Sequence, residues 1–464
     1  MPLENKENRL FIVGLGPGAR KQMTLQALKV LWEADAIVGY RPYLEMIPDL
    51  LPGKKVESSS MGREVDRVKT AVDLLKEGSV ALVSSGDPNI YGMAGLGMEM
   101  AKDTARVEVV PGVTSFTAAA CKAGIVFREA VAVISLSDLL TPWSEIEARL
   151  KLAEELNLPV AIYNPRSRRR DWQMKRALEI LGSDKDVLVA RNVARHGEET
   201  TWTRAKDLLE DRGPEVDMFT LLIVVGRGMT QAQTFQDAVI SIVGTGPGGH
   251  DWLTLEAEEA LRNSAKIFGA GRYLGSIKGI TSGEAVSHTG TCEERMAARI
   301  KEAKTSADRG DKISLLTGGD PSIFSSAHRY LRSGMKARVC PGISAFSAIA
   351  AKAGAPLVND FVLVSEAHAS QIGRLARAGF GVVIYNIDGP KLQPILEVLD
   401  PSRPCVLARD ISREGEVVMA MTSSDMMEAH PIGHRFTLLA ASRNSYIKSG
   451  RVVTRRGYEI KYSY

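Results

Sequence analysis

The sequence lacks the features that mark exported and membrane proteins. Its apolar stretches are short: residues 219–225 are among the longest, and they fall far below the roughly 20 residues that a membrane span needs. Residues 1–9 are polar and charged and do not contain the basic, apolar and cleavage regions of an export signal in series. We therefore expect a cytoplasmic protein with no membrane partner.

Cysteine is also scarce, with four residues in a chain of 464. Their isolation excludes a disulfide framework and a local Cys-x-x-Cys metal site, so we expect no metal. We interpret them as buried small residues in a reducing compartment. They are Cys121, Cys292, Cys340 and Cys405.

Neither charge nor aromatic content favours a nucleic-acid partner. Lys and Arg number 59 against 55 Asp and Glu, which gives a net charge of +4, and aromatic residues make up only 6%. A general nucleic-acid or anionic-membrane binder needs a larger basic excess, and single-strand binders need aromatic stacking platforms. The 44% apolar and 25% charged residues are typical of a folded protein, and the length suits two to four packed units.

The chain contains one long internal repeat. Three segments of the first half return in the second half in the same order and 230 to 233 residues later, and the offset falls to 217 at the last shared strand because the second copy is shorter. Self-similarity of this kind indicates two copies of one fold, which arose either by duplication and divergence of one gene or by fusion of a second, related one. The paired segments are residues 11–39 with 241–269, 80–94 with 313–327, and 107–124 with 337–354.

Each copy alternates short β-branched runs with segments of helical period. In the first copy we predict helices over residues 24–33, 64–77 and 116–123, separated by strands. Such alternation indicates an α/β fold with largely parallel sheets, and a copy of this length has room for two lobes, or four in the chain. Residues 226–238 are polar and predict a short linker.

Glycine-rich turns follow three of the predicted strands. GLGPG at residues 14–18 lacks the third glycine of a nicotinamide fingerprint, so we do not expect a nicotinamide Rossmann site. SSGDPNIYGMAG at 84–95 and PGVTS at 111–115 follow further along, and α/β proteins bind ligands at such strand ends. Their recurrence in both copies favours a binding site over simple tight turns.

This combination of turns resembles the tetrapyrrole methyltransferase family, which uses S-adenosyl-L-methionine (SAM) to methylate porphyrin and corrin precursors. The resemblance implies a tandem repeat of the α/β tetrapyrrole methylase fold, each copy having two α/β lobes with a ligand cleft between them. It also implies a small-molecule tetrapyrrole substrate, and fused copies that pack as an intramolecular pseudo-dimer or a homodimer. Carried over by motif, the implied cofactor residues are Pro17, Asp87, Ile90, Thr114, Ser115 and Tyr163 in the first copy and Pro247, Asp320, Ile323, Ser344, Ala345 and Tyr385 in the second.

Longer strings in the first copy are similar to the precorrin-3B C(17)-methyltransferases, the ring-contracting branch of the family in cobalamin biosynthesis. They include SLSDLLTPW at residues 135–143 and YNPRSRRRDWQ at 163–173. The resemblance implies an acceptor rich in carboxylates, which guanidinium groups bind in bidentate fashion. A solvated basic loop is the alternative interpretation. The candidate substrate residues are Arg166, Arg168, Arg169 and Arg170.

The second copy lacks both the SDLLTPW segment and the arginine cluster. We expect ring contraction in residues 1–235 and a different or lost role in 236–464, with a second corrin methylation of the precorrin-6 C(5) type as one alternative and a macromolecule methyltransferase of the same fold as another. Precorrin-3B and its cobalt form remain open as substrates. His196 is able by type to carry a proton, but we interpret it as a solvated surface residue, and we assign no catalytic residue.

Overall fold

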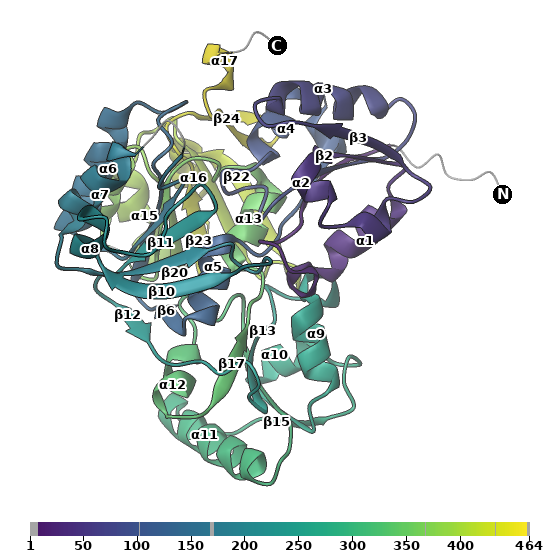
Figure 1. Ribbon diagram of the computed structural model, residues 1–464, viewed down its shortest axis with the longest axis vertical. Coiled ribbons are helices and arrows are strands. Elements are labelled where there is room, and N and C mark those ends of the chain that lie inside the picture. Colours follow the sequence, from purple (N-terminus) through teal and green to yellow (C-terminus); the bar gives the residue numbers. More distant parts are fainter. Residues whose placement is uncertain (1–7, 102, 168–170, 367, 432, 462–464) are drawn as a thin grey trace.

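The computed structural model describes residues 8–101, 103–167, 171–366, 368–431 and 433–461. Each copy begins with a five-stranded parallel lobe, at the upper right of Figure 1 for the first copy and at the bottom for the second. The strand orders β3-β2-β4-β1-β5 and β15-β14-β16-β13-β17 correspond strand for strand. In sequence order the strands are β1 (Leu10–Gly14), β2 (Ala36–Tyr40), β3 (Lys55–Ser59), β4 (Val80–Ser84) and β5 (Val107–Val110), then β13 (Ile240–Gly244), β14 (Lys266–Phe268), β15 (Glu284–Val286), β16 (Ile313–Thr317) and β17 (Ala337–Cys340).

Helices cover these two parallel sheets. Thr24 and its equivalent Thr254 cap the helices that follow the first turn, each accepting a hydrogen bond at 3.1 Å from the backbone three residues on. The first-lobe elements are η1 (Arg20–Gln22), α1 (Leu25–Glu33), α2 (Arg41–Leu44), η2 (Pro48–Leu50), α3 (Glu64–Leu74), α4 (Ala94–Met100), η3 (Thr104–Arg106) and α5 (Ser115–Lys122), and in the second copy η4 (His250–Trp252), α9 (Leu255–Arg262), α10 (Gly271–Ser276), α11 (Cys292–Asp308), α12 (Ala327–Arg332) and α13 (Ala345–Ala353).

The second lobes of the two copies share one ten-stranded sheet of order β10-β9-β11-β8-β7-β19-β20-β23-β21-β22. The predicted α/β repeat is confirmed, and the second lobes of the two copies join through β7 and β19. The strands are β7 (Ala130–Ser135), β8 (Val160–Tyr163), β9 (Asp186–Arg191), β10 (Glu199–Arg204), β11 (Thr220–Val224), β19 (Phe361–Val364), β20 (Gly381–Ile387), β21 (Pro404–Arg409), β22 (Val417–Thr422) and β23 (Phe436–Ala440).

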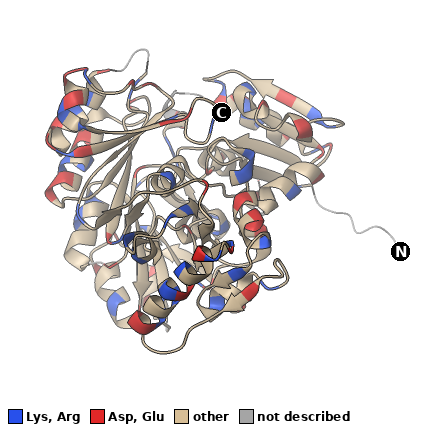
Figure 2. Cartoon of the chain, turned by 60° about the horizontal axis from the view of Figure 1, so that its bottom comes forward, with Lys and Arg blue, Asp and Glu red and all other residues tan. Residues whose placement is uncertain are grey.

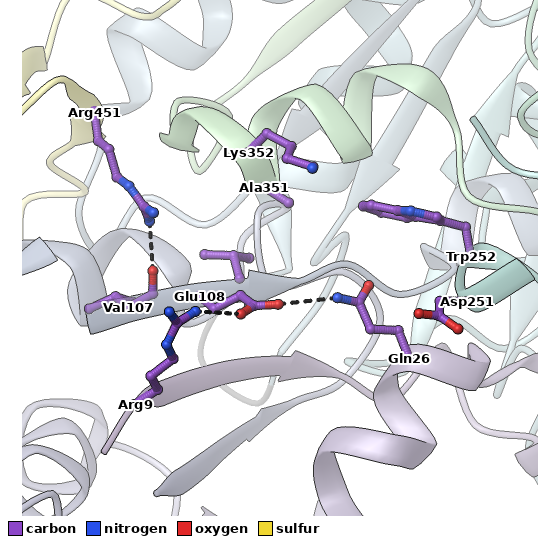
Figure 3. A pocket seen from close by; sticks show the side chains of 10 residues that line it. Arg9, Gln26, Val107, Glu108, Asp251, Trp252, Ala351, Lys352 and Arg451 are labelled. Atoms are coloured by element: carbon purple, nitrogen blue, oxygen red, sulfur yellow. Dashed lines mark hydrogen bonds and ion pairs between the residues drawn. The ribbon is translucent and has the colours of Figure 1, made fainter. Parts of the chain in front are cut away.

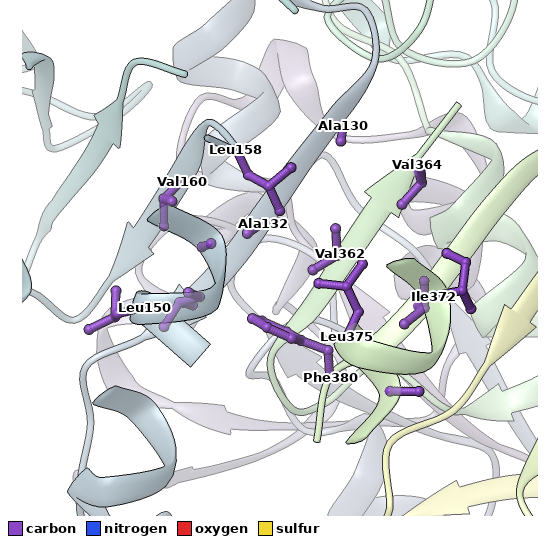
Figure 4. Packing of buried hydrophobic residues seen from close by; sticks show 14 of the residues in the cluster. Ala130, Ala132, Leu150, Leu158, Val160, Val362, Val364, Ile372, Leu375 and Phe380 are labelled. Carbon is purple, nitrogen blue, oxygen red and sulfur yellow. The ribbon is translucent and has the colours of Figure 1, made fainter. Parts of the chain in front are cut away.

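This shared sheet is mixed rather than largely parallel, since β9, β10 and β11 pair antiparallel with their neighbours. Strand β7 alternates its side chains between two cores: Ala130 and Ala132 face the layer drawn in Figure 4, and Val131 and Val133 face the other side. Helices close the layer shown there. They are α6 (Trp143–Glu155), α7 (Trp172–Leu181), α8 (Ala205–Leu209), α14 (Ala369–Arg377), α15 (Gly389–Glu397) and α16 (Ser423–Ala429).

A pseudo-twofold axis relates the two copies. Three contacts join residues that are equivalent by the 230-residue offset: Ala132 pairs with Val362 in the sheet, Thr24 bridges Thr254, and the ring of Phe116 stacks on that of Phe346 at 6.3 Å. A residue that contacts its own equivalent lies on the symmetry axis. The copies therefore pack as an intramolecular pseudo-dimer with an interface in both lobes.

Two small sheets complete the chain. β6 (Ile125–Phe127) pairs with β12 (Met229–Gln231), so part of the predicted linker is a strand. β18 (Gly354–Ala355) pairs with β25 (Arg451–Thr454), which forms a hairpin with β24 (Ser445–Lys448) before α17 (Tyr458–Lys461). This C-terminal segment, residues 445–461, belongs to the second copy but contacts α4 of the first.

Several local predictions need correction. The helix predicted over residues 64–77 ends at Leu74, where the next residues form turns before Gly78. Cys292 is exposed because it lies in the first turn of α11 on the surface, whereas the other three cysteines are buried as expected. All four are free thiols.

We predict that Phe346→Ala destabilises both copies. Phe346 is fully buried and its ring also lies 5.7 Å from that of Phe361, so truncation should cost about 3–5 kcal/mol through lost burial and a cavity. Urea unfolding followed by circular dichroism and tryptophan fluorescence should show one lowered midpoint. Phe219→Ala, at a side chain 52% exposed, should change stability by no more than about 0.5 kcal/mol. An unchanged midpoint in Phe346→Ala would contradict the interface described here.

Candidate functional site

The three glycine-rich turns of the first copy lie against one another at the carboxyl ends of β1, β4 and β5. The amide of Gly86 donates to the carbonyl of Gly16 at 2.8 Å, and the reverse bond measures 3.2 Å. A Cβ atom at Gly112 would lie 2.2 Å from the carbonyl oxygen of Gly86. Only glycine permits this approach, so the turns form one backbone unit. In the second copy Gly246, Gly319 and Gly342 repeat the arrangement.

Tyr163 connects the second lobe to these turns. Its hydroxyl oxygen accepts from the backbone N–H of Phe116 at 3.1 Å, which leaves its proton for Thr114 Oγ1 at 2.7 Å. Burial raises the pKa of Tyr163, so the phenol stays protonated. The ring of Tyr91 lies 5.2 Å away between centroids. Two predicted cofactor residues, Thr114 and Tyr163, are therefore in direct contact across the lobes.

An arginine that sequence reasoning missed also joins the lobes. Arg195 Nε donates to the carbonyl oxygen of Pro17 at 2.8 Å, and its Nη2 donates to Ser85 Oγ at 2.8 Å. In the second copy Arg413 Nε donates to the carbonyl of Pro247 at 2.7 Å. The repeat contains a signal that could have identified them: in both copies, one residue separates the arginine from a following Gly-Glu pair. His196, the neighbour considered instead, is exposed, as expected.

The Asp87 carboxyl organises its own turn. Oδ1 accepts from the backbone N–H of Asn89 at 2.9 Å and from its side-chain amide at 3.0 Å. Oδ2 is buried without a hydrogen-bond partner among the described residues, and the hydroxyl of Ser347, from the second copy, approaches the carboxyl and acts to lower its pKa. Burial raises the pKa of Asp87 to about 6, against the opposing effect of these neighbours. The carboxyl thus faces the interface between the copies.

Asp320 repeats this arrangement in the second copy. Its Oδ1 accepts from the Ser322 amide at 2.8 Å, its Oδ2 accepts from the Gly342 amide at 3.1 Å, and Cys121 of the first copy donates to Oδ1 at 3.5 Å. Burial raises its pKa. Each acidic turn is therefore contacted by the helix, α5 or α13, of the opposite copy.

A cleft of about 310 Å³ opens between the lobes of the second copy. Four arginines line it: Arg272, Arg409, Arg413 and Arg435. In the first copy the residues equivalent to Arg272 and Arg435 are Pro42 and Met218. All six cofactor residues predicted for this copy also line the cleft, namely Pro247, Asp320, Ile323, Ser344, Ala345 and Tyr385.

The structure describes only some of the other residues predicted for the cofactor and substrate sites. Ile90 is buried in the core shared by the copies, and Ser115 begins α5. Arg166 forms a half-exposed ion pair with Asp171 at 2.8 Å. Arg168, Arg169 and Arg170 lie outside the described residues.

Another cavity, of about 340 Å³, lies between the copies and is drawn in Figure 3. Several of its polar groups are already paired: Glu108 accepts from Gln26 at 3.2 Å and lies 3.5 Å from Arg9, and Arg451 donates to the carbonyl of Val107 at 2.6 Å. None of the turn residues lines it. We therefore regard it as packing between the copies.

Within the described ranges, no three His, Cys, Asp or Glu side chains gather as a metal ion would require. No helix in that part of the chain is both long and apolar enough to span a bilayer.

Comparison with known proteins places both copies in one family. The family model of the tetrapyrrole (corrin/porphyrin) methylases matches residues 9–209 and 239–426. Cobalamin biosynthesis protein CbiHC of Archaeoglobus fulgidus is 44% identical over 230 residues, which are 48% of this chain and 50% of that protein. A probable cobalt-factor III C(17)-methyltransferase of Salmonella typhimurium is 39% identical over 232 residues, which are 48% of this chain and 95% of that protein. The crystal structure of the methyltransferase CobJ matches 47% of this chain and 95% of its own chain, with 33% identity and a TM-score of 0.44. The match spans about half the length of the Archaeoglobus relative.

We predict that Asp87→Asn stabilises the protein more at pH 8 than at pH 4. The native pKa of about 6 lies above the ordinary value of 3.8, so wild-type stability falls as pH rises between these values. An asparagine keeps the Oδ1 acceptor and removes this dependence. The difference in unfolding free energy between variant and wild type should grow by up to about 3 kcal/mol over that range.

The control is Asp73→Asn, which removes a carboxylate whose side chain is 74% exposed. Comparing urea unfolding of both variants with wild type across the pH series separates burial from loss of charge. An Asp87→Asn effect that is constant with pH would contradict the burial of an ionised carboxyl at this turn.

Proposed function

Because the chain belongs to the tetrapyrrole (corrin/porphyrin) methylases, we propose that its first copy is a SAM-dependent methyltransferase of cobalamin biosynthesis. Its acceptor is a corrinoid precursor, precorrin-3B or the cobalt form, which it methylates at C(17) with ring contraction. The observation that carries this proposal is the joining of the three turns and Tyr163 at one strand edge. The names of the Archaeoglobus and Salmonella relatives, a cobalamin biosynthesis protein and a probable cobalt-factor III C(17)-methyltransferase, support the corrinoid assignment.

The residues at this edge fit SAM. The cofactor presents an amino-acid end, a ribose and an adenine, which need hydroxyls, backbone amides and an apolar wall. The Thr114 hydroxyl, the turn amides and the Tyr91 ring offer these groups. We propose Pro17, Asp87, Ile90, Thr114, Ser115 and Tyr163 as the cofactor site, with the Asp87 loop contributing through its backbone.

When bound, SAM supplies an electrophilic methyl group. The chain then has to hold the acceptor carbon in line with that methyl and exclude water. Arg195 fixes the loop of Pro17 against Ser85, so the distance between the lobes is set before ligands bind. The buried phenol of Tyr163 holds Thr114 in place.

We propose that the loop after β8 binds carboxylates of the acceptor through Arg166, Arg168, Arg169 and Arg170. The ion pair of Arg166 with Asp171 is half exposed, and a pair of this kind contributes little stability. A substrate carboxylate can therefore replace Asp171 at low cost. The equivalent loop of the second copy has no arginine.

We assign C(17) methylation to residues 1–235 and a different role to residues 236–464. The second copy keeps the turns, but its cleft carries Arg272 and Arg435 in place of Pro42 and Met218. A second corrin methylation there remains the alternative. A macromolecule methyltransferase is less well supported, since Figure 2 shows Lys and Arg interspersed with Asp and Glu over the visible helices.

The experiment combines purified full-length protein with SAM and either precorrin-3B or cobalt-factor III, and reads product mass and ring contraction. Thr114→Val should weaken SAM binding by about fivefold or more, as loss of one hydrogen bond costs about 1 kcal/mol and Tyr163 loses its partner. Ser344→Ala, the matched variant of the second copy, should leave product formation unchanged.

Two outcomes would contradict the proposal. Absence of methyl transfer to any corrinoid would reject the activity. Loss of product in Ser344→Ala with full activity in Thr114→Val would assign the reaction to the other copy. Calorimetry with SAM on both variants identifies which copy binds it.

A further inference from the structure

A cavity of about 230 Å³ beside Tyr91 has walls from both copies. The first copy contributes Tyr91, Ser135, the start of α3 and the loop that follows β7. In that loop Leu139 is 63% exposed and presents an apolar surface. The second copy contributes Asn359, Asp360, Arg456 and Tyr458.

Asp360 fixes the first-copy wall from the opposite copy. Its Oδ1 accepts from Tyr91 Oη at 2.8 Å and from the backbone N–H of Ser135 at 3.0 Å. Its Oδ2 pairs with Arg149 Nη1 at 2.8 Å, with both side chains only 5–6% exposed. Since both oxygens are engaged, Asp360 is a positioning residue. Its equivalent in the first copy is Ala130, so the reciprocal contact does not exist.

Arg456 brings a guanidinium to this cavity. Its central carbon lies 5.2 Å from the centroid of the Tyr91 ring, a cation–π distance. It makes no ion pair with any residue that the structure describes, whereas its neighbour Arg455 pairs with Glu99 at 3.4 Å and lies over Tyr446 at 5.0 Å. The other acidic side chain at the cavity, Glu64, accepts from the Gly62 amide.

The C-terminal segment that carries Arg456 is fastened to the first copy. Lys448 Nζ donates to the carbonyl oxygens of Glu99 and Ala101 at 3.3 and 2.9 Å, and Arg451 donates to the carbonyl of Val107. β25 pairs with β18, which contacts α4 of the first copy. The guanidinium of Arg456 is therefore held in position relative to the first-copy site.

We propose that this cavity is a carboxylate subsite for the tetrapyrrole acceptor of the first copy, with Arg456 of the second copy binding one acidic side chain of the macrocycle. An arginine already stacked on an aromatic ring keeps its N–H groups available at its edge, and these bind a carboxylate in bidentate fashion. Leu139 and Leu140 supply apolar contact beside it. The proposal rests on the proposed function and adds that the first-copy site is complete only with the tail of the second copy.

Steady-state methyl transfer by full-length Arg456→Gln, Arg456→Lys and Arg455→Gln tests the subsite. Arg456→Gln should raise the KM for the corrinoid by about tenfold or more through loss of a charged hydrogen bond, with kcat and the Kd for SAM close to wild type. Arg456→Lys should recover part of the affinity, because it keeps the charge and loses the bidentate geometry. Arg455→Gln should lower the Tm with little change in KM.

The experiment distinguishes failure of the subsite from failure of the proposed methyl transfer. If wild type methylates the corrinoid and Arg456→Gln has an unchanged KM, the subsite is rejected and the proposed function stands. An equal rise in KM in Arg455→Gln would show a general effect of the tail and also reject it. If wild type transfers no methyl group to any corrinoid, both proposals fail.

Discussion

The antiparallel pairing of β7 with β19 is the contact on which the rest of the molecule depends. An unpaired strand at the edge of a sheet exposes backbone donors and acceptors and invites association with other chains. Here each copy covers the same edge of the other, and the pairing of Ala132 with its equivalent Val362 makes the contact self-complementary. Two five-stranded sheets thereby become one, with a common core on each face.

The same axis brings the two candidate sites into contact. Phe116 and Phe346 stack at the start of α5 and α13, the helices that begin at the third turn of each copy. Further along, Ser347 approaches Asp87 and Cys121 donates to Asp320. Each acidic turn is therefore supported by a helix of the other copy, so neither cleft is structurally independent, whichever ligand it binds.

Much of this arrangement was predictable from the sequence, because local patterns encode it. The repeat, the α/β alternation and the three turns are visible as recurring strings, and two residues named by the motif comparison, Thr114 and Tyr163, are in contact in the structure. A sequence motif indicates which loop is shared with the family, but not what each atom of that loop does. The carboxyl of Asp87 turns into the copy interface, so we interpret its presence in the motif as a requirement of the shape of the turn.

Other features were not predictable, since they depend on which distant segments meet. Periodicity specifies that β7 is a buried strand but does not specify its partner 230 residues away. In the sequence, Asp360 is an acidic residue that follows an asparagine, and no local pattern distinguishes it. Only the pseudo-twofold packing of the copies places it against Tyr91. The contact between the C-terminal segment of the second copy and α4 of the first was likewise not predictable from local sequence.

The two copies differ in how the arginines at the ends of β9 and β21 are neutralised. In the first copy Arg191 Nε lies 2.8 Å from Asp217, with Glu215 3.2 Å from its Nη1. Its equivalent Arg409 lies 3.4 Å from Asp410 and stacks on Phe436, while Arg272, Arg413 and Arg435 line the same cleft. A sulfonium carries positive charge, so unneutralised guanidinium groups raise its free energy of binding, whereas they lower that of a carboxylate. The second copy therefore shares the backbone turns of the first, while the arginines of its cleft favour anionic groups over a cation.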